Sequence, residues 1–415
     1  MQWMATIRWS NKSDFYYNFS CSQQTIEMAN IMANLKTFQP EYGIGTNEPL
    51  FRLRSCAKGL MVNACAHALF FCKLLNATKQ KEDNCGDVPA GSQASKDNQI
   101  LKIGIIGGGH LGKQLARTLL HLGAISGKNI QISTRRPETL LEFHKLGVEC
   151  VYNNKQLISW ADVAFLCCLP CHLPHICSEI HDSLKNTCII YSLVTAIPLD
   201  RLKQLMSSCS ILRPQYKCSE NSSFSLWEAN RTVLEALKDT AVIQATCPCN
   251  SKSEIAVNMK WLAAVFYTAL NSYTEQHLSY TKALGLLNQV CFCEGNATTS
   301  SPFLVCEHFI NQAFASSLAA DDSFPWFDIT TVQLKDSPLS QSLETNTSLQ
   351  EFIASSYFNM ITALAKKSED LTTSMTKKIP LSAVLLKPTK SLVFQIDEMS
   401  AKKTEETSST DSEDL

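Results

Sequence analysis

Three glycines, Gly107, Gly109 and Gly112, have the spacing with which a backbone turn can hold the pyrophosphate of a dinucleotide. Gly107 permits a tight turn, Gly109 has no Cβ and lets the backbone approach the phosphates, and Gly112 lets the following helix pack closely. The start of that helix would offer the backbone N–H groups of His110 and Leu111, together with a partial positive charge. The spacing therefore predicts a pyrophosphate site.

The flanks of these glycines supply the structural context that such a site needs. The apolar run Ile103–Ile106 precedes the turn and is typical of a buried strand. Leucines recur at helical spacing directly after it, at Leu111, Leu115 and Leu119. A strand, a glycine turn and a helix in this order make the motif much more specific than the spacing alone.

The end of the next predicted strand indicates which dinucleotide is bound. An acidic residue there would hydrogen-bond the ribose 2′-hydroxyl of NAD, whereas Arg accommodates the 2′-phosphate of NADP. The chain has Ser133, Thr134, Arg135 and Arg136 at this place, and its next acid is Glu138. Two hydroxyls and two planar guanidinium groups suit a phosphate, so NADP(H) is the predicted cofactor. The alternative is a solvated basic turn with no ligand.

A third candidate contact follows the long apolar run 162–169. Leu169 and Pro170 come where this run ends, and the carboxyl ends of parallel strands face the ligand crevice. We expect Pro170 to redirect the chain there, so that both residues border the adenosine or nicotinamide side of the cofactor.

Strand and helix patterns alternate between about residues 99 and 247. This alternation predicts an α/β fold, a Rossmann-type doubly wound parallel sheet with helices on both faces. The predicted strands are 103–106, 129–134, 149–152, 162–169, 188–194 and 210–213. The predicted helices between them are one that includes 117–122, then 137–146, 154–160, 172–184 and 199–207.

The rest of the chain differs in pattern. Residues 1–98 read as an N-terminal extension with one helix, 57–75, and a polar linker. Residues 248–375 read as a mainly helical domain, and 376–415 as a polar tail whose acidic end, 402–415, is predicted to be disordered. The helices expected in the helical domain are 255–273, 276–290, 302–318 and 349–364.

Composition restricts the class of protein. The 415 residues are 45% hydrophobic, enough for sizeable cores, and the net charge of −1 does not favour a nucleic-acid partner. The apolar run 59–71 is shorter than the roughly 20 residues that a membrane span requires, so we expect a buried or partner-packing helix. No secretory signal is recognisable at the N-terminus. We therefore expect a cytoplasmic protein with its 18 cysteines reduced.

Cysteines and histidines cluster between Cys167 and Cys177. Cys168 and Cys171 have the spacing of a redox pair, and the cluster contains metal-capable groups. A closed zinc site usually needs a second ligand pair elsewhere, and the other pairs here are C-x-C. Buried free thiols are the simpler interpretation, so no metal is predicted.

Residues 102 to about 213 resemble the N-terminal domain of pyrroline-5-carboxylate reductases. The resemblance lies in the glycine segment 103–112, the turn 133–137 and the segments 145–148, 153–154 and 160–170. It implies an NADP(H)-dependent oxidoreductase in which hydride passes to a C=N or C=O bond of a small molecule. Members of the family assemble through their helical domain, which implies a homo-oligomer.

The chain departs from that family where the substrate would bind. The family has Lys-Pro where this chain has Leu169-Pro170, and Asn-Thr-Pro where it has Arg213 to Tyr216. Its Gly-Ser-Gly-Pro stretch is missing here, and its Ser-Pro-Gly-Gly-Thr-Thr segment is reduced to Ser337-Pro338. Those glycines would supply exposed N–H groups for a carboxylate.

Two alternatives to an enzyme therefore stay open. The chain could bind NADP(H) without turnover, as a sensor or partner-binding pseudoenzyme, or it could be a scaffold that has lost nucleotide binding. No catalytic residue is selected by the sequence. Proton donors could come from the second domain, and nothing distinguishes among Tyr267, Tyr273, Tyr280 and His277.

Overall fold

A computed structural model provides the fold. The described residues are 48–79, 100–207, 210–220, 222, 224–227, 231–250, 253–292 and 304–377. The predicted disordered end, 402–415, and most of the predicted linker lie outside these residues. Every site discussed below belongs to the unit that ends at Asp370.

Six strands form one parallel sheet in the order β3-β2-β1-β4-β5-β6. Their register aligns Ile106, the last residue of β1, with Ser133 on one side and Leu166 on the other, so the carboxyl ends of three strands coincide. This strand order is that of a Rossmann fold and confirms the predicted fold class. The strands are β1 (Ile103–Ile106), β2 (Ile130–Ser133), β3 (Glu149–Val151), β4 (Val163–Leu166), β5 (Ile189–Ser192) and β6 (Ile211–Leu212).

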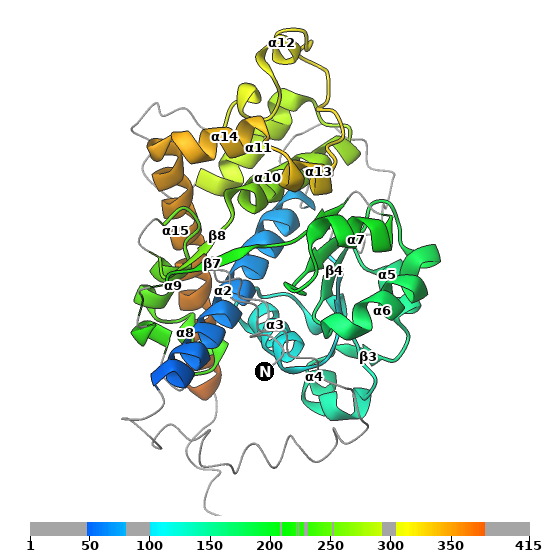
Figure 1. Ribbon diagram of the computed structural model, residues 1–415, viewed down its shortest axis with the longest axis vertical. Coiled ribbons are helices and arrows are strands. Elements are labelled where there is room, and N and C mark those ends of the chain that lie inside the picture. The colour runs from blue at the N-terminus through cyan, green and yellow to red at the C-terminus, as the bar shows by residue number, and fades with distance from the viewer. Residues whose placement is uncertain are drawn as a thin grey trace, which may run out of the picture. The chain divides into compact units, whose positions relative to one another are not determined.

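Helices cover both faces of the sheet because successive strand residues point to opposite sides. Ile103 and Ile105 join a core with helices on one face, whereas Ile106 joins the core on the other. The first face carries α2 (Glu48–Lys79) and α3 (His110–His121). The second carries α5 (Asn154–Trp160), α6 (Leu173–Ile180) and α7 (Leu199–Met206), and Figure 1 shows these three on one side of the strands.

The helix α2 lies within the main core. The predicted helix 57–75 is present and is longer, from Glu48 to Lys79. By length and composition alone its segment Pro49–Lys79 could cross a membrane, but 78% of the most apolar window is buried inside the protein. The polar side chains of Asn63 and His67 are also buried, and His67 bonds to other elements. These contacts are those of a core helix.

The second half of the described chain is mainly helical, as predicted, but two expectations about it are wrong. Residues 255–257 form a strand, β8 (Ile255–Val257), which pairs antiparallel with β7 (Tyr216–Cys218). The expected helix 302–318 is replaced by two short helices, the 3-10 helix η9 (Cys306–His308) and the α-helix α12 (Gln312–Ala315). The long helices are α10 (Met259–Glu275), α11 (Tyr280–Phe292) and α15 (Thr347–Lys377), accompanied by the shorter α13 (Ile329–Leu334) and α14 (Pro338–Thr345).

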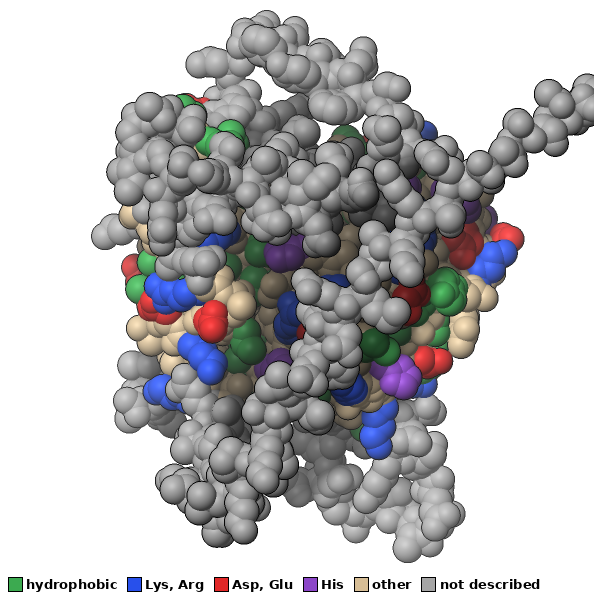
Figure 2. All heavy atoms as spheres, turned by 90° about the horizontal axis from the view of Figure 1, so that it is seen from below, with side chains coloured by type: hydrophobic (Ala, Val, Ile, Leu, Met, Phe, Trp, Pro, Cys, Tyr) green, Lys and Arg blue, Asp and Glu red, His purple; other side chains and the backbone are tan. Residues whose placement is uncertain are grey.

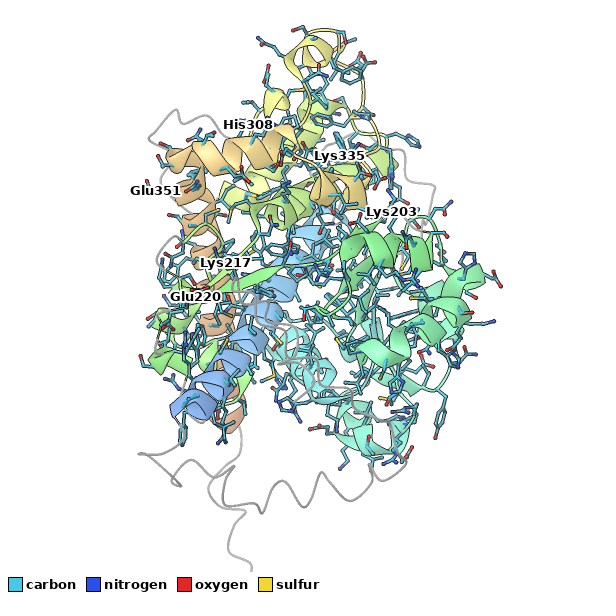
Figure 3. The ribbon with its side chains drawn as sticks, viewed as in Figure 1. Lys203, Lys217, Glu220, His308, Lys335 and Glu351 are labelled. Carbon is cyan, nitrogen blue, oxygen red and sulfur yellow. The ribbon has the colours of Figure 1, made fainter. Side chains whose placement is uncertain are left out.

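Side chains of α13 satisfy the outer edge of β6. Thr330 Oγ1 accepts from Ile211 N at 3.1 Å, and Gln333 Nε2 donates to Ile211 O at 2.6 Å. An edge strand with unpaired N–H and C=O groups would otherwise need water or another strand. Beside this contact, Lys203 of α7 bonds Asp328 at 3.1 Å, and Figure 3 shows Lys203 facing the α13 side of the sheet.

Charged side chains of both signs are mixed on the surface. Figure 2 shows Lys and Arg interspersed with Asp and Glu over the described part of one face. This mixture agrees with the net charge of −1.

His67 is the most deeply buried histidine that the structure describes, with 1% of its surface exposed. Nε2 lies 2.8 Å from Thr246 O and must donate to it, so Nδ1 accepts from the Tyr216 hydroxyl at 3.0 Å. The Tyr216 ring stacks on the imidazole, and the Trp261 ring packs against it at a tilt of 37°. Burial lowers the pKa of His67 to about 4, so the side chain is neutral at pH 7.

This burial predicts acid-sensitive stability. An unfolded histidine binds a proton near its usual pKa of 6.5, so the unfolded state gains protons first as the pH falls toward 4. Between pH 7 and pH 4, His67 should therefore remove about 3 kcal/mol from the free energy of unfolding. Urea unfolding across this range measures the loss. The variant His67→Gln should lose less stability than the native chain, and parallel pH curves for the two proteins would contradict the assignment.

Candidate functional site

The turn after β1 has backbone geometry that only glycine accepts easily. Gly107 has φ +113°, and a Cβ there would lie 2.8 Å from the carbonyl carbon and oxygen of Cys167. Its N–H donates to Ser133 O at 2.9 Å, and Cys167 N donates to Ile106 O at 2.8 Å. The turn is thus held against the carboxyl ends of β2 and β4.

Gly109 and Gly112 differ in what surrounds them. A Cβ on Gly112 would lie 2.1 Å from Gly107 O, so this glycine lets α3 begin directly against the turn. A Cβ on Gly109 would meet nothing within 4 Å. Gly109 therefore borders open space, and its missing side chain leaves room for a ligand to approach the backbone.

The N-terminus of α3 faces this space without a cap from the protein. Gly109 is the N-cap residue, no side chain accepts from the first turn, and the first turn contains no acidic residue. The N–H groups of His110 and Leu111 belong to the set that a helix cannot satisfy internally. Such a helix start suits an anion, so the residues present fit a pyrophosphate.

The turn after β2, residues 133–136, lies beside the glycine turn. A Cβ on Gly108 would lie 3.0 Å from the Cβ of Thr134, so the turn after β2 contacts the glycine turn. Arg135 and Arg136 are exposed and make no ion pair within the described part of the chain. Both guanidinium groups can therefore turn toward a phosphate.

Ser133 occupies a different position from the other three residues of this turn. Its side chain is buried, and its hydroxyl donates to Asn154 Oδ1 at 2.6 Å. Asn154 in turn donates to Glu179 at 2.8 Å. Ser133 contributes to the site by fixing the end of β2 and by accepting from Gly107. Sequence reasoning missed Asn154 and Glu179 as supports, because their link to β2 depends on α5 and α6 meeting there.

The surroundings of the glycine turn are cationic. Burial lowers the pKa of His110, and the positive charges of Arg117 and Lys113 lower it further. His110 is therefore mainly neutral at pH 7. Lys113 reaches Thr139 O at 3.4 Å, and Arg117 pairs with Glu142 at 2.7 Å. Their charge favours an anion at the start of α3.

Leu169 and Pro170 lie at the third predicted position. The strand β4 ends at Leu166, and Pro170 begins the short helix η6 (Pro170–His172), which turns the chain as expected. Leu169 is 41% exposed, so its side chain can reach a ligand at the end of β4. The structure thus brings all three predicted segments to the carboxyl edge of β1, β2 and β4.

The cysteine cluster after β4 has no metal-binding geometry. Among the described residues, no group of three His, Cys, Asp or Glu side chains could hold a metal ion. Burial raises the pKa of Cys168 to about 12, so its thiol is protonated. The Cys168 thiol therefore lacks the reactivity of a redox-active thiolate.

The four side chains considered as proton donors do not gather at the carboxyl edge of the sheet. Tyr267 on α10 donates to Phe309 O at 2.8 Å, and burial raises its pKa to about 12. Tyr273 is buried on the same helix, and His277 lies just beyond its end. Tyr280 begins α11. None of these positions identifies a catalytic acid.

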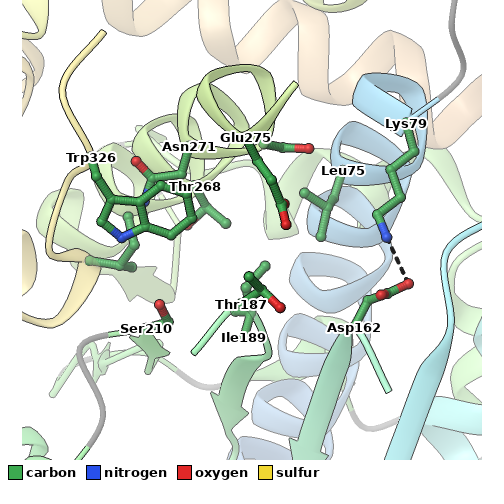
Figure 4. A pocket seen from close by; sticks show the side chains of 12 residues that line it. Leu75, Lys79, Asp162, Thr187, Ile189, Ser210, Thr268, Asn271, Glu275 and Trp326 are labelled. Atoms are coloured by element: carbon green, nitrogen blue, oxygen red, sulfur yellow. Dashed lines mark ion pairs between the residues drawn. The ribbon is translucent and has the colours of Figure 1, made fainter. Parts of the chain in front are cut away.

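A cavity of about 70 Å³ lies at the opposite, amino edge of the sheet. Figure 4 shows it bordered by the Lys79–Asp162 ion pair of 2.7 Å, by the start of β5 and by Trp326. Nucleotides bind at the carboxyl edge of such sheets, so this cavity is separate from the glycine turn.

Comparisons with known proteins agree with this geometry. Residues 102–195 match the family model described as NADP oxidoreductase coenzyme F420-dependent. The chain is 40% identical over 339 residues to NADP-dependent oxidoreductase domain-containing protein 1 of Mus musculus, a match that covers 79% of this chain and 92% of that protein. The chain belongs to the family of this mouse protein.

More distant relatives are pyrroline-5-carboxylate reductases. Pyrroline-5-carboxylate reductase 3 of Danio rerio is 28% identical over 112 residues, which cover 27% of this chain and 39% of that protein. The solved pyrroline-5-carboxylate reductase of Coxiella burnetii aligns over 65% of this chain and 98% of its own, with 14% identity and a TM-score of 0.27. The predicted resemblance is confirmed, and the chain contains an oxidoreductase-like NAD(P)-binding domain of this type.

The two glycines of the helix start predict different effects of the same substitution. Gly109→Ala should fold with an unchanged Tm, since its Cβ enters open space, yet weaken NADPH binding at least about 10-fold by blocking the approach to the backbone. Gly112→Ala should also weaken NADPH binding. In addition, it should lower the free energy of unfolding by about 1–3 kcal/mol, because its Cβ overlaps Gly107 O. Thermal unfolding and NADPH titration by fluorescence measure both effects.

Gly285→Ala is the matched control for this pair. Gly285 lies within α11, and a Cβ there would meet nothing within 4 Å, so the variant should bind NADPH normally and gain about 0.5–1 kcal/mol of stability. Normal NADPH binding by Gly109→Ala would place the pyrophosphate elsewhere.

Proposed function

We propose that this chain binds NADP(H) at the carboxyl edge of its sheet and acts as an oxidoreductase on a small molecule with a C=N or C=O bond. The uncapped start of α3 beside Gly109 carries the proposal, because it offers donors and open space together. The cofactor NADP(H) is inferred from the hydroxyls and guanidinium groups of residues 133–136, and the imine substrate class from the family resemblance. We place the protein in the cytoplasm and expect it to form homo-oligomers through its helical region.

Each segment of the site has a separate task in this proposal. The N–H groups of His110 and Leu111 would bind the pyrophosphate, and Gly107 and Gly112 keep them in position. Thr134, Arg135 and Arg136 would bind the 2′-phosphate, with Ser133 holding the end of β2. Leu169 and Pro170 would border the bound nucleotide and exclude water.

NADPH, when bound, supplies the hydride that reduces a substrate, and the protein supplies position and electrostatics. Positioning of two reactants in one crevice can account for a large part of a rate enhancement. Turnover should therefore depend on the residues that orient the cofactor, even where no side chain donates a proton.

A second candidate function, binding of NADP(H) without turnover, is favoured by the segment 337–340. Ser337 caps α14, its N–H donates to Ser340 Oγ at 2.8 Å, and Ser340 N donates back to Ser337 Oγ at 3.2 Å. Both N–H groups are thus used within the protein. The pyrroline-5-carboxylate reductases have glycines here that would offer such groups to a carboxylate, so this chain lacks that way of holding an imino acid.

Oxidation of bound NADPH distinguishes the two functions. Stopped-flow absorbance should show NADPH consumed with at least one member of a panel of cyclic imines, linear imines and ketones. Tight NADPH binding without consumption of NADPH across the panel would support the sensor instead. Absence of NADPH binding would overturn both.

The double variant Arg135→Ala/Arg136→Ala tests the 2′-phosphate contact. Charge-assisted hydrogen bonds contribute about 1.5–3 kcal/mol each, so the affinity for NADPH should fall at least about 10-fold while that for NADH changes less than about threefold. Calorimetric titration with both nucleotides measures the difference.

Lys128→Ala/Lys185→Ala is the control, since it removes two exposed positive charges near the amino ends of β2 and β5. It should leave both affinities unchanged. An equal loss of NADPH and NADH affinity in the arginine variant would show that these side chains do not contact the 2′-phosphate.

A further inference from the structure

Two thiols from distant parts of the chain meet where α2 crosses β7. Cys56 Sγ lies 3.2 Å from Cys218 Sγ, although the residues are 162 positions apart. Cys56 is buried, and Cys218 is partly exposed. Lys217 and Glu220, labelled in Figure 3, show where this end of β7 lies in the molecule.

The contact between these elements is held by close packing. A Cβ on Gly59, one turn after Cys56, would lie 2.5 Å from Ile255 Cδ1 and 2.9 Å from the Trp227 ring. The helix α2 therefore lies directly against β8, the partner strand of β7. The distance between the two thiols is set by this packing and not by a flexible loop.

Arg52 fixes the chain that follows β7. Its guanidinium donates to the carbonyl oxygens of Ser222 at 3.0 Å and Ser219 at 3.3 Å, and to that of Glu220. It also lies 5.6 Å from the centre of the Phe224 ring. Arg52 is one helical turn from Cys56, so it brings a positive charge close to the thiol pair.

The two thiols differ in acidity. The hydrogen bond from Cys218 and the charge of Arg52 lower the pKa of Cys56, against the opposing effects of burial and of Glu254. The same hydrogen bond and burial raise the pKa of Cys218. Cys56 is therefore the more acidic thiol of the pair, and thiolate character is what favours attack on an oxidant.

Two other cysteines in the described part of the chain have pKa values shifted in the opposite direction from that of Cys56. Burial raises the pKa of Cys65 on the same helix to about 12, and it raises the pKa of Cys188 to about 12 as well. Cys56 and Cys218 combine a close neighbour with a favourable charge.

We propose that Cys56 and Cys218 are a reversible oxidation site, at which a hydroperoxide converts the thiol pair to a disulfide that links α2 to β7. The Cys56 thiolate attacks one peroxide oxygen and the O–O bond breaks, which gives a sulfenic acid and hydroxide (or alkoxide). That leaving group takes up the proton that the Cys56 thiol released and departs as water (or alcohol). Cys218 then attacks the Cys56 sulfur, the S–O bond breaks, and the oxygen leaves as water with the Cys218 proton. Two thiols are oxidised and one peroxide is reduced.

The disulfide would tie together two elements that already share a hydrogen bond between side chains. Tyr216 begins β7 and bonds His67, which lies three helical turns beyond Cys56 on α2. A covalent link between positions 56 and 218 constrains the unfolded chain across a long loop. Oxidation should therefore stabilise the folded protein.

Peptide mapping of the full-length reduced chain tests the proposal. After graded exposure to hydrogen peroxide, alkylation and digestion, the peptide joining Cys56 to Cys218 should appear before any other disulfide and disappear with dithiothreitol. The Tm should rise by a few degrees on oxidation and return on reduction. Recovery of both cysteines as separate alkylated or sulfinic peptides, while other thiols oxidise, would overturn the proposal.

Variants separate this pair from general oxidation. Cys56→Ser and Cys218→Ser should each abolish the linked peptide and the shift in Tm, whereas Cys150→Ser, a change at a partly exposed thiol on β3, should retain both. If neither variant folds, cross-linking of the native chain with dibromobimane replaces them. This reagent bridges only neighbouring thiols, and failure to join Cys56 to Cys218 would also overturn the proposal.

Discussion

The contact between the start of α3 and the turn after β1 is the constraint on which the candidate site depends. Backbone meets backbone there, because Gly112 lies against Gly107 O with no room for a Cβ. This contact sets the direction of α3, leaves its first N–H groups facing open space, and brings the turn within bonding distance of Ser133 O. The ends of β2 and β4 can then contribute to one crevice.

The rest of the molecule supports this edge through α2 and α13. The helix α2 fills one face of the sheet and joins it to α10 in a single core. His67 adds hydrogen bonds to Tyr216 and Thr246 within that core. On the far side, Thr330 and Gln333 complete the edge of β6. The Rossmann sheet is therefore continuous with the helical region through both apolar packing and specific polar contacts.

Local patterns predicted the sheet well. All six strands overlap predicted ones, and the glycine spacing placed the turn, because apolar or alternating patterns and glycine spacing depend on neighbouring residues alone. The strand Ile255–Val257 was predicted as part of a helix because it is short and apolar. Its partner strand, Tyr216–Cys218, lies about 40 positions earlier, so no local pattern indicates the pairing. The burial of Ser133 and the meeting of Cys56 with Cys218 depend on packing between distant segments, which periodicity does not encode.

The two halves of the proposed site are built in different ways. On the cofactor side, donors are left unsatisfied by the protein at the start of α3. Around Ser337, the corresponding donors are consumed by a capping box. A carboxylate held at that segment would have to break two internal hydrogen bonds, at a cost that binding must recover. In the proposed oxidoreductase, a substrate would therefore have to be held by other groups at the carboxyl edge. Arg213 lies there, at the end of β6, with its guanidinium bonded to Thr195 O at 2.6 Å. If the proposed function holds, a cation at this place would favour a negatively charged or strongly polar substrate over an apolar one.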